Sequence, residues 1–528
     1  MMLRDALIAL SLANLCFFRV WRELLDGKLA YYSRTSPAPH LVAVLLDVLL
    51  VASALFAGAT LARRGGNPSV IRIARCLFLL LVAANLRFGQ LALTFRERFG
   101  WPGLALWLAL LVLILFVIAR WGKPLARLAA VLLLIASPFV LVTAAQGAWL
   151  LYRLQQMSFA DPGVTRPRAP SDSARAPRVL WLVLDELDQR LAFAERPGSI
   201  SLTQFDRLRG QSLYAPNAYP PGRMTELSMP ALFTGKLVAR TEPRGSDELL
   251  LWFGDARGSV AEQPRPWTAE PGIFARAGNT ALIGWYHPYC RVLRGPSQCA
   301  WQDGPLLLGA VRRDANVAQA MWDQAESTLD TWFGLARFGL LPNRLRRERE
   351  EDVHDYQALF EAGKKAAVDP AYGFVVVHLP VPHPIGFYDR ARGEYRLDGA
   401  PSYLDNLVLA DRTLGELRAA MEQAGVWERT TIIVTADHWW RADFWRRQPG
   451  WTPEDEAAYA GRLDHRVPLL VRFPFQSLPL VIAQPLNTVL LHDLTLAILS
   501  GEIADAPAAA RWLEAHATFG ESPYNTRK

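Results

Sequence analysis

The stretch VLWLVLDELD (179–188) decides the fold, because a short apolar run that ends in carboxylates is typical of a buried parallel strand. Two later stretches share this plan: YGFVVVHLPVPHP (372–384) ends in histidines, and RTTIIVTADHWW (429–440) ends in an Asp-His pair. Between these two, residues 403–425 carry apolar side chains at helical spacing and end in a glycine. Strand, helix and strand in this order predict an α/β domain with a mostly parallel central sheet.

Potential metal ligands follow all three predicted strands. Ligands of open α/β sheets gather beyond the C-terminal ends of the strands, so these side chains are expected to meet at one edge. Carboxylate oxygens suit divalent cations, and imidazole nitrogens add a preference for zinc or manganese. The sequence therefore predicts a site for one or two metals, and the candidate ligands are Asp185, Glu186, His383, Asp437, His438 and His465.

The stretch RMTELSMPALFTGK (223–236) has two interpretations. Thr225 stands at the start of a predicted helix, where threonine is a good N-cap. A threonine hydroxyl can also act as a nucleophile when a base or a metal activates it, and a helix N-terminus favours an anion at the same place. The stretch alone leaves both interpretations open.

The first 152 of the 528 residues hold most of the apolar excess and predict a membrane domain. A helix needs about 20 mostly apolar residues to span a bilayer. The net charge of +7 lies largely in short loops between apolar runs, which is a membrane-topology pattern and argues against nucleic acid as a partner. Five spans are predicted, at 6–18, 41–62, 76–95, 101–119 and 125–152.

Lys and Arg are more frequent in the second and fourth loops than in the first and third, which predicts that the second and fourth are cytoplasmic. Five spans then place the remainder outside the plasma membrane. The first span could instead be a signal peptide, but no cleavage site follows it promptly. Asp47 and Arg87 lie within predicted spans. They are expected to form an ion pair between helices or to snorkel to the interface, or else Arg87 contacts an anionic lipid headgroup.

A linker rich in Pro, Ser and Arg follows the spans. We therefore predict a transmembrane domain over 1–155, a linker over 156–177 and a second domain over 178–528. Cys290 and Cys299 lie close together in the sequence of the second domain. They are expected either to form a disulfide or to remain free thiols.

The order of these motifs resembles the alkaline phosphatase and sulfatase superfamily over about residues 177–500. The stretch 217–236 resembles its nucleophile segment, and alignment on Thr234-Gly235 puts Thr225 at the nucleophile and Ser228 at the signature serine. Sulfatases need Cys or Ser at the nucleophile position. Threonine is instead typical of the membrane-anchored branch, the phosphoethanolamine transferases and the lipoteichoic acid synthase-like phosphoglycerol transferases.

The resemblance implies roles for individual residues. Thr225 would be the nucleophile, and His383 and His465 would bind the phosphate or protonate the leaving group. Ser228 and His378 would contact the substrate, although His378 could belong to the core. His287 is a weaker candidate, and a glycine of the family is replaced here by Trp439. The implied ligands of Zn²⁺ (or Mn²⁺) are Asp185, Glu186, Thr225, Asp437 and His438, of which Asp185 matches sulfatases and not the transferases.

The implied activity is transfer of a phospholipid headgroup, phosphoglycerol or phosphoethanolamine, through a phospho-threonine intermediate. The donor would be a membrane phospholipid and the acceptor an envelope glycan or lipid. The implied location is the bacterial inner membrane, with the catalytic domain on the periplasmic side. Two alternatives remain: a phosphodiesterase or phosphatase with water as acceptor, and an inactive module of envelope assembly. Trp439, Trp440 and Trp445 are expected either to wall a glycan or lipid site or to pack in the core.

Overall fold

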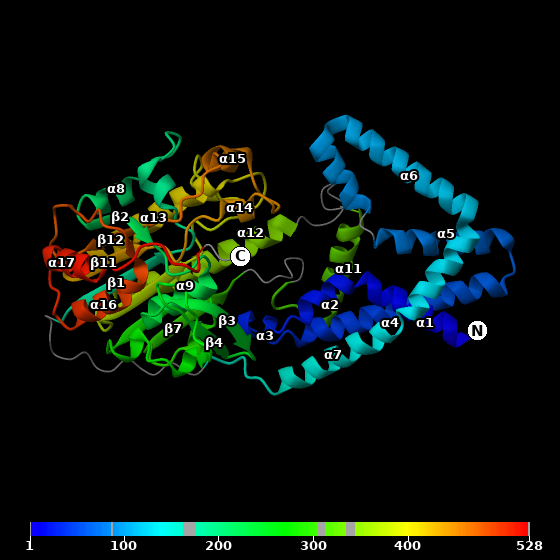
Figure 1. Ribbon diagram of the computed structural model, residues 1–528, viewed down its shortest axis with the longest axis horizontal. Helices are drawn as coiled ribbons and strands as arrows, with labels where there is room; N and C mark the ends of the chain where they lie inside the picture. Colours follow the sequence, from blue (N-terminus) through cyan, green and yellow to red (C-terminus); the bar gives the residue numbers. More distant parts are fainter. Residues whose placement is uncertain (1, 86–87, 162–175, 305–311, 334–343, 526–528) are drawn as a thin grey trace. The chain divides into compact units, whose positions relative to one another are not determined.

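The computed structural model describes residues 2–85, 88–161, 176–304, 312–333 and 344–525 (Figure 1). The chain divides into two compact units, a helical unit and an α/β unit. The helical unit contains residues 1–158 and 306–344, and the α/β unit contains residues 159–305 and 345–528. The predicted continuous domain over 178–528 is therefore interrupted, because its segment 306–344 groups with the N-terminal helices.

The helices of the helical unit form mainly along long apolar runs of the sequence. The longest of these helices, α6 (Phe88–Ile135), continues through Pro102 and Pro124 without a break between the fourth and fifth predicted spans. The other helices are α1 (Met2–Cys16), α2 (Phe18–Leu24), α3 (Leu29–Tyr32), α4 (Ala38–Arg64), α5 (Pro68–Ala84), α7 (Pro138–Gln155) and α11 (Val317–Phe333).

Helix α11 comes from the interrupting segment and packs on α4 and α6. Ala320 of α11 packs in an apolar cluster with Ala43 of α4. Polar contacts add to this packing: the Gln324 side-chain amide donates to the carbonyl of His40 at 2.9 Å, and Arg19 donates to the Thr331 hydroxyl at 3.2 Å. Asp323 and Gln324 are fully buried. Buried polar side chains of this kind fix the place of α11 within the helical unit.

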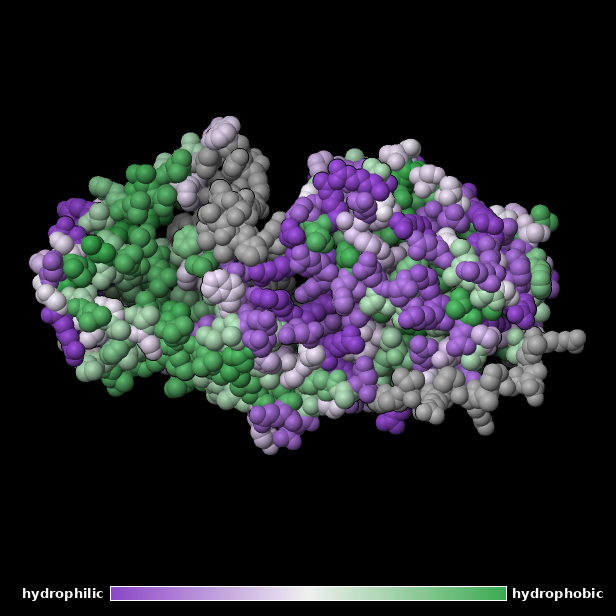
Figure 2. Space-filling model, turned by 180° about the vertical axis from the view of Figure 1, so that it is seen from behind, coloured by the Kyte–Doolittle hydropathy of each residue, from purple (hydrophilic) through white to green (hydrophobic). Residues whose placement is uncertain are grey.

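Two helices in the described part of the chain are long and apolar enough to cross a membrane, at Ala38–Arg64 and Trp101–Ile135. The sequence predicted five such spans, whereas the described residues contain two candidates. Helices α1 and α5 have 15 and 17 residues, fewer than the roughly 20 needed to cross the bilayer core. Figure 2 shows apolar side chains over the outside of the helical unit, and exposed members include Leu50, Leu113, Phe116 and Leu141. Arg87 lies outside the described residues, so its pairing with Asp47 stays a prediction.

The α/β unit is built on a nine-stranded sheet in the order β13-β2-β12-β11-β1-β8-β6-β7, with β14 beside β2. All neighbours pair in parallel except those of β12, so the predicted mostly parallel sheet is confirmed. The strands are β1 (Arg178–Leu184), β2 (Leu213–Tyr219), β6 (Thr280–Tyr286), β7 (Gln298–Asp303), β8 (Phe374–Leu379), β11 (Thr430–Thr435), β12 (Val467–Arg472), β13 (Leu480–Val481) and β14 (Leu486–Asn487).

Helices cover both faces of this sheet, which explains why β1 is apolar at every position. Leu180 and Leu182 face a core shared with α12 (Arg344–Val368) and α13 (Tyr403–Gln423). On the opposite face, Trp181 meets Phe233 of α9 (Thr225–Thr234) edge to face, and α16 (Leu491–Leu499) packs on β1 and α9. The remaining larger elements are α8 (Thr203–Arg209), α10 (Tyr289–Val292), α14 (Ala442–Trp445), α15 (Pro453–Tyr459), α17 (Ala506–His516) and a small antiparallel sheet of β3 (Val238–Arg244), β4 (Glu248–Phe253) and β5 (Arg265–Pro266).

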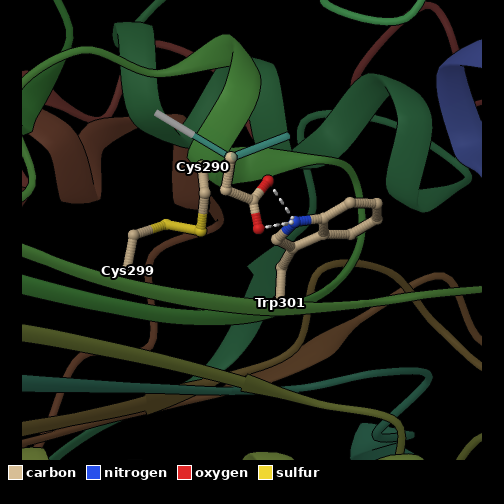
Figure 3. The surroundings of a disulfide bond; sticks show 4 residues. Cys290, Cys299 and Trp301 are labelled. Carbon is tan, nitrogen blue, oxygen red and sulfur yellow. Dashed lines mark hydrogen bonds between the residues drawn. A yellow bond between two sulfur atoms is a disulfide. The ribbon is translucent and has the colours of Figure 1, made fainter. Parts of the chain in front are cut away.

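A disulfide joins Cys290 in α10 to Cys299 in β7 (Figure 3), which settles the alternative that the sequence left open. On the same strand, the Trp301 indole donates to both carboxylate oxygens of Asp161 at 3.0 and 3.1 Å. Asp161 belongs to the predicted linker, whose residues 162–175 lie outside the described part of the chain. The start of the linker is thus held against β7.

Candidate metal centre

The end of β1 presents two neighbouring acids to the same edge of the sheet. Side chains alternate across a strand, so adjacent residues share an edge only where the strand turns. Glu186 makes this turn with a φ of +60°, in the left-handed region that non-glycine residues seldom adopt. Such backbone strain is concentrated at functional sites. Both Asp185 and Glu186 are fully buried.

Thr225 is the first residue of α9, and Met224 occupies the N-cap position. The prediction that Thr225 is the N-cap is therefore wrong, because Thr225 lies one position later, as the first residue of the helix. Its hydroxyl instead lies 3.3 Å from Asp185 Oδ2 and 3.3 Å from His438 Nε2. The ring of His287 contacts the Thr225 carbonyl at 3.3 Å, so this helix start is held from the other side as well.

The ends of β1, β8 and β11 bring their polar side chains together beside this hydroxyl. His438 Nε2 lies 3.3 Å from Asp437 Oδ2 and 3.7 Å from Asp185 Oδ1. His378 Nε2 lies 3.8 Å from Asp185 Oδ2. Among the described residues, possible ligand atoms lie within 4.8 Å of one another in two groups that share Asp185. The first group adds Glu186 and His438, and the second adds His378 and Asp437.

Burial sets the protonation of this cluster. It raises the pKa of Asp437 to about 8, with a further contribution from the charge of Asp185, and it also raises the pKa of Asp185 well above its usual value. Burial lowers the pKa of His378 to about 4 and that of His438 well below its usual value. The histidines are therefore neutral at pH 7, which is the form that binds a metal.

Three atoms of the cluster test whether a cation fits here. Asp185 Oδ1, Asp437 Oδ2 and His378 Nε2 are buried and have no hydrogen-bond partner in the structure. Buried polar atoms are nearly always paired, and buried carboxylates without a partner are costly. A divalent cation would satisfy all three atoms and compensate the carboxylate charge. Mixed oxygen and nitrogen donors suit zinc or manganese, so the residues present fit the predicted group.

Glu186 is placed differently from Asp185. Arg441 binds its carboxylate with guanidinium contacts at 2.7 and 2.8 Å, and the Trp445 indole donates to both oxygens at 2.9 and 3.0 Å. Both Glu186 oxygens therefore already have partners, whereas Asp185 directs an unpaired oxygen into the cluster. Of the two predicted carboxylate ligands, Asp185 has the better geometry for a metal.

His383 and His465 lie outside the group of closest ligand atoms. His383 packs edgewise between the rings of Trp285 and Trp445, at 5.0 and 4.9 Å between centroids. Burial, with Arg441 nearby, lowers the pKa of His383 well below its usual value. A histidine that is neutral at pH 7 is a poor proton donor, which argues against His383 as the general acid.

His465 stacks on Trp439, the neighbour of His438, at 4.3 Å between ring centroids, and its Nδ1 pairs with Glu521. This imidazole is partly exposed. The predicted role of His465 as proton donor stays a prediction.

The Ser228 hydroxyl donates to the Gly222 carbonyl at 2.8 Å. Gly222 is required there, because a Cβ at this position would lie 2.7 Å from Leu227 Cβ and 3.1 Å from Ser228 Oγ. The hydroxyl thus holds the loop before α9, and its predicted contact with substrate stays a prediction.

The three tryptophans that were expected to wall a glycan or lipid site, or to pack in the core, have different surroundings. Trp440 is buried between the rings of Tyr403 and Trp451, at 4.5 and 5.5 Å, so both its faces are covered. Trp439 is buried beneath His465. Packing is therefore the role of these two rings, whereas Trp445 takes part in the site through Glu186.

Sequence reasoning missed Arg441 and Tyr289 as parts of the site. Arg441 follows the Asp-His motif by three residues, and that proximity is the signal that could have identified it. The Tyr289 hydroxyl contacts His378 Nδ1 at 3.1 Å. Tyr289 belongs to a segment with no motif, so only the folded structure reveals this contact.

One protein family matches part of the α/β unit. Residues 279–439, which include the Asp437–His438 pair, match the family model of type I phosphodiesterase / nucleotide pyrophosphatase. A search of curated proteins found no match to the chain.

Similar solved structures include three bacterial proteins. A sulfatase from Pseudoalteromonas sp. has 20% identity and a TM-score of 0.43, covering 62% of this chain and 69% of the sulfatase. An alkaline phosphatase superfamily protein from Vibrio parahaemolyticus has 14% identity, a TM-score of 0.34 and coverages of 62% and 67%. The lipoteichoic acid synthase LtaP from Listeria monocytogenes has 13% identity, a TM-score of 0.36 and coverages of 64% and 76%. The family match over residues 279–439 confirms the predicted resemblance to the alkaline phosphatase superfamily.

Proposed function

We propose that this chain is a membrane-bound, metal-dependent transferase that moves a phospholipid headgroup through a phospho-threonine intermediate. The observation that carries the proposal is the place of the Thr225 hydroxyl, at the start of α9 and 3.3 Å from both Asp185 Oδ2 and His438 Nε2. A hydroxyl held among buried carboxylates and neutral imidazoles has the surroundings of an activated nucleophile.

In the first step, Thr225 Oγ1 forms a bond to the phosphorus of the donor phosphodiester, and its proton moves toward Asp185 Oδ2. A zinc or manganese ion bound at the cluster would lower the pKa of the hydroxyl and stabilise charge on the phosphoryl oxygens. The N-terminal end of α9 favours the same anion. The bond from phosphorus to the diacylglycerol oxygen breaks, and this oxygen takes a proton, for which His465 is the proposed donor.

In the second step, the oxygen of an acceptor hydroxyl forms a bond to the phosphorus and its proton returns to His465. The bond from phosphorus to Thr225 Oγ1 breaks, and Oγ1 takes back the proton held by Asp185. Arg441 lies at the same edge, and through Glu186 it is fixed where it can face an anionic substrate. The transferred group is phosphoglycerol or phosphoethanolamine, and the acceptor is an envelope glycan or lipid.

The helical unit supports a lipid as the donor. Two of its helices can span a bilayer, and large apolar side chains are exposed along them. Exposed apolar surface of this extent marks a membrane or protein contact. We propose a multi-pass inner-membrane protein with its α/β unit on the periplasmic side, where the donor headgroup is present in the same membrane.

The matched family model favours a second candidate, a phosphodiesterase of the same site that uses water as acceptor. Both candidates use Thr225 and the cluster in the first step. They differ in the product. With water as acceptor the headgroup phosphate is released into solution, whereas with a glycan or lipid as acceptor it becomes bonded to that molecule.

The test measures diacylglycerol released from radiolabelled phospholipid vesicles by the full-length chain with Zn²⁺ or Mn²⁺. Thr225→Ala is expected to abolish release, and Thr225→Ser, which keeps a hydroxyl, is expected to retain part of it. If Thr225→Ala were as active as the parent chain, the proposed mechanism would be refuted. A parent chain that bound no metal and released no diacylglycerol would instead support the inactive assembly module.

A further inference from the structure

His378 contributes one ring nitrogen to the cluster and the other to a tyrosine. Its Nε2 is buried, lacks a hydrogen-bond partner and lies 3.8 Å from Asp185 Oδ2. Its Nδ1 lies 3.1 Å from the Tyr289 hydroxyl. A neutral imidazole carries one proton, so if Nε2 directs its lone pair at a cation, Nδ1 must carry the proton. Nδ1–H then donates to Tyr289 Oη, and this bond, together with a backbone hydrogen bond between His378 and Trp285, holds the tautomer and the ring orientation.

The Tyr289 ring is held tightly enough to orient its neighbour. The ring is fully buried and contacts Phe233, Trp267 and His287, with centroids 5.8, 6.2 and 5.6 Å away. Gly284 in β6 makes room for it, because a Cβ at Gly284 would lie 2.3 Å from the Tyr289 ring. A larger residue at 284 would displace the hydroxyl from His378.

The backbone of Tyr289 is fixed as well. Tyr289 begins α10, and the next residue, Cys290, is joined by the disulfide to Cys299 of β7 (Figure 3). Strand β7 pairs in parallel with β6, with Cys299 opposite Leu282. The segment that carries Tyr289 is thus tied covalently to the sheet whose strand ends form the cluster.

We propose that Tyr289 is a positioning residue of the metal centre, which orients His378 so that Nε2 faces the cation held by Asp185 and Asp437. The inference rests on the metal site of the proposed function. Hydrogen-bond partners of this kind fix the orientation of ligating histidines, and their loss costs roughly 10- to 100-fold in metal affinity.

The test measures Zn²⁺ affinity of the purified full-length chain by competition with a chromophoric chelator, so it needs no substrate. Tyr289→Phe removes only the hydroxyl, and we expect it to weaken Zn²⁺ binding by roughly 10-fold. The matched control is Tyr356→Phe. That tyrosine is also buried, and its hydroxyl bonds to Thr413 at 2.6 Å in the core between α12 and α13. The control should leave the affinity unchanged.

A double-mutant cycle with His378→Ala separates positioning from a general loss of packing. With His378 absent, Tyr289→Phe is expected to cause no further loss of Zn²⁺ affinity. An equal loss in both backgrounds, or no loss in the parent chain, would overturn the proposal. Neither outcome depends on transfer activity, so a failure of Tyr289 as positioning residue is distinguishable from a failure of Thr225 as nucleophile.

Discussion

The two units of this chain place their side chains in opposite ways. The helical unit exposes large apolar residues, such as Leu50 and Phe116, whereas the α/β unit buries charged ones, such as Asp185 and Asp437. Each arrangement is unfavourable for a chain in water alone, since apolar surface prefers lipid and buried carboxylates require a compensating charge. This difference supports the two proposals made above, that the helical unit lies in a bilayer and that the α/β unit binds a cation.

The largest expected effect comes from breaking the buried cluster. Asp185→Asn removes a charged ligand with an unpaired oxygen. Loss of a residue that only hydrogen-bonds to a ligand costs up to about 100-fold in metal affinity, so we expect loss of the ligand itself to lower Zn²⁺ affinity by more than about 100-fold. Equilibrium dialysis followed by metal analysis measures this loss.

Glu186→Gln is the matched control for that substitution, since it neutralises the neighbouring acid. Because Arg441 and Trp445 hold the Glu186 carboxylate, the loss of affinity should be smaller than for Asp185→Asn. If the two variants lost the metal equally, Glu186 would be the ligand that the family resemblance implies.

A second prediction concerns the exposed apolar surface. Leu113 lies in α6 with 53% of its surface exposed, and Leu113→Arg should cost about 2.5–3.5 kcal/mol on insertion near the bilayer centre. The fraction of protein recovered in washed membranes should fall. The control is Leu463→Arg, which changes a leucine with 43% exposure in the α/β unit and should have no effect. Equal recovery of both variants would contradict membrane insertion of α6.

The pH dependence of stability sharpens the comparison further. The folded pKa of Asp437 is about 8 and its usual value is 3.8, so between these values the folded protein binds more protons than the unfolded protein. Metal-free protein should therefore lose stability as pH rises from about 4 to 8. Thermal unfolding of chelator-treated protein at several pH values measures this loss, which bound Zn²⁺ should remove. Asp437→Asn should flatten the profile, and an unchanged profile would contradict the assigned cause.

The smallest expected effect is that of Ser228→Ala. The lost hydrogen bond to the Gly222 carbonyl should lower the free energy of unfolding by about 1 kcal/mol, without change in Zn²⁺ affinity. Thermal unfolding and metal titration measure the two quantities. A large loss of transfer activity with unchanged stability would instead show that Ser228 contacts the substrate, as the family resemblance implies.

Periodicity predicted the central strands well, because buried parallel strands are continuous apolar runs. The runs at 372–384 and 429–440 contain β8 and β11, and the run at 179–188 contains β1 except for its first residue. The helix predicted at 403–425 is α13, which begins with a Ser402 capping box. The return of segment 306–344 to the helical unit was not predictable in this way. Its contacts join residues almost 300 positions apart, and local patterns carry no information about such pairs.

The candidate site was predictable to the level of strand ends and no further. Motifs place Asp185, Thr225, Asp437 and His438 at one edge, and the folded chain brings them together. The different surroundings of Asp185 and Glu186 depend on the positive φ of Glu186 and on its ion pair with Arg441. A strand pattern in the sequence predicts neither feature. Five membrane spans were predicted where the described residues contain two candidate spans, because apolar runs were counted without the helix boundaries that tertiary structure sets.

The central claim is that Thr225 carries the headgroup between donor and acceptor. The most direct measurement is mass spectrometry of the Thr225 peptide after the full-length chain meets phosphatidylglycerol and phosphatidylethanolamine vesicles with Zn²⁺, followed by an acid quench. The account predicts an added phosphoglycerol or phosphoethanolamine on Thr225, absent from Asp185→Asn. Release of diacylglycerol with an unmodified Thr225, or with the adduct on another residue, would contradict it.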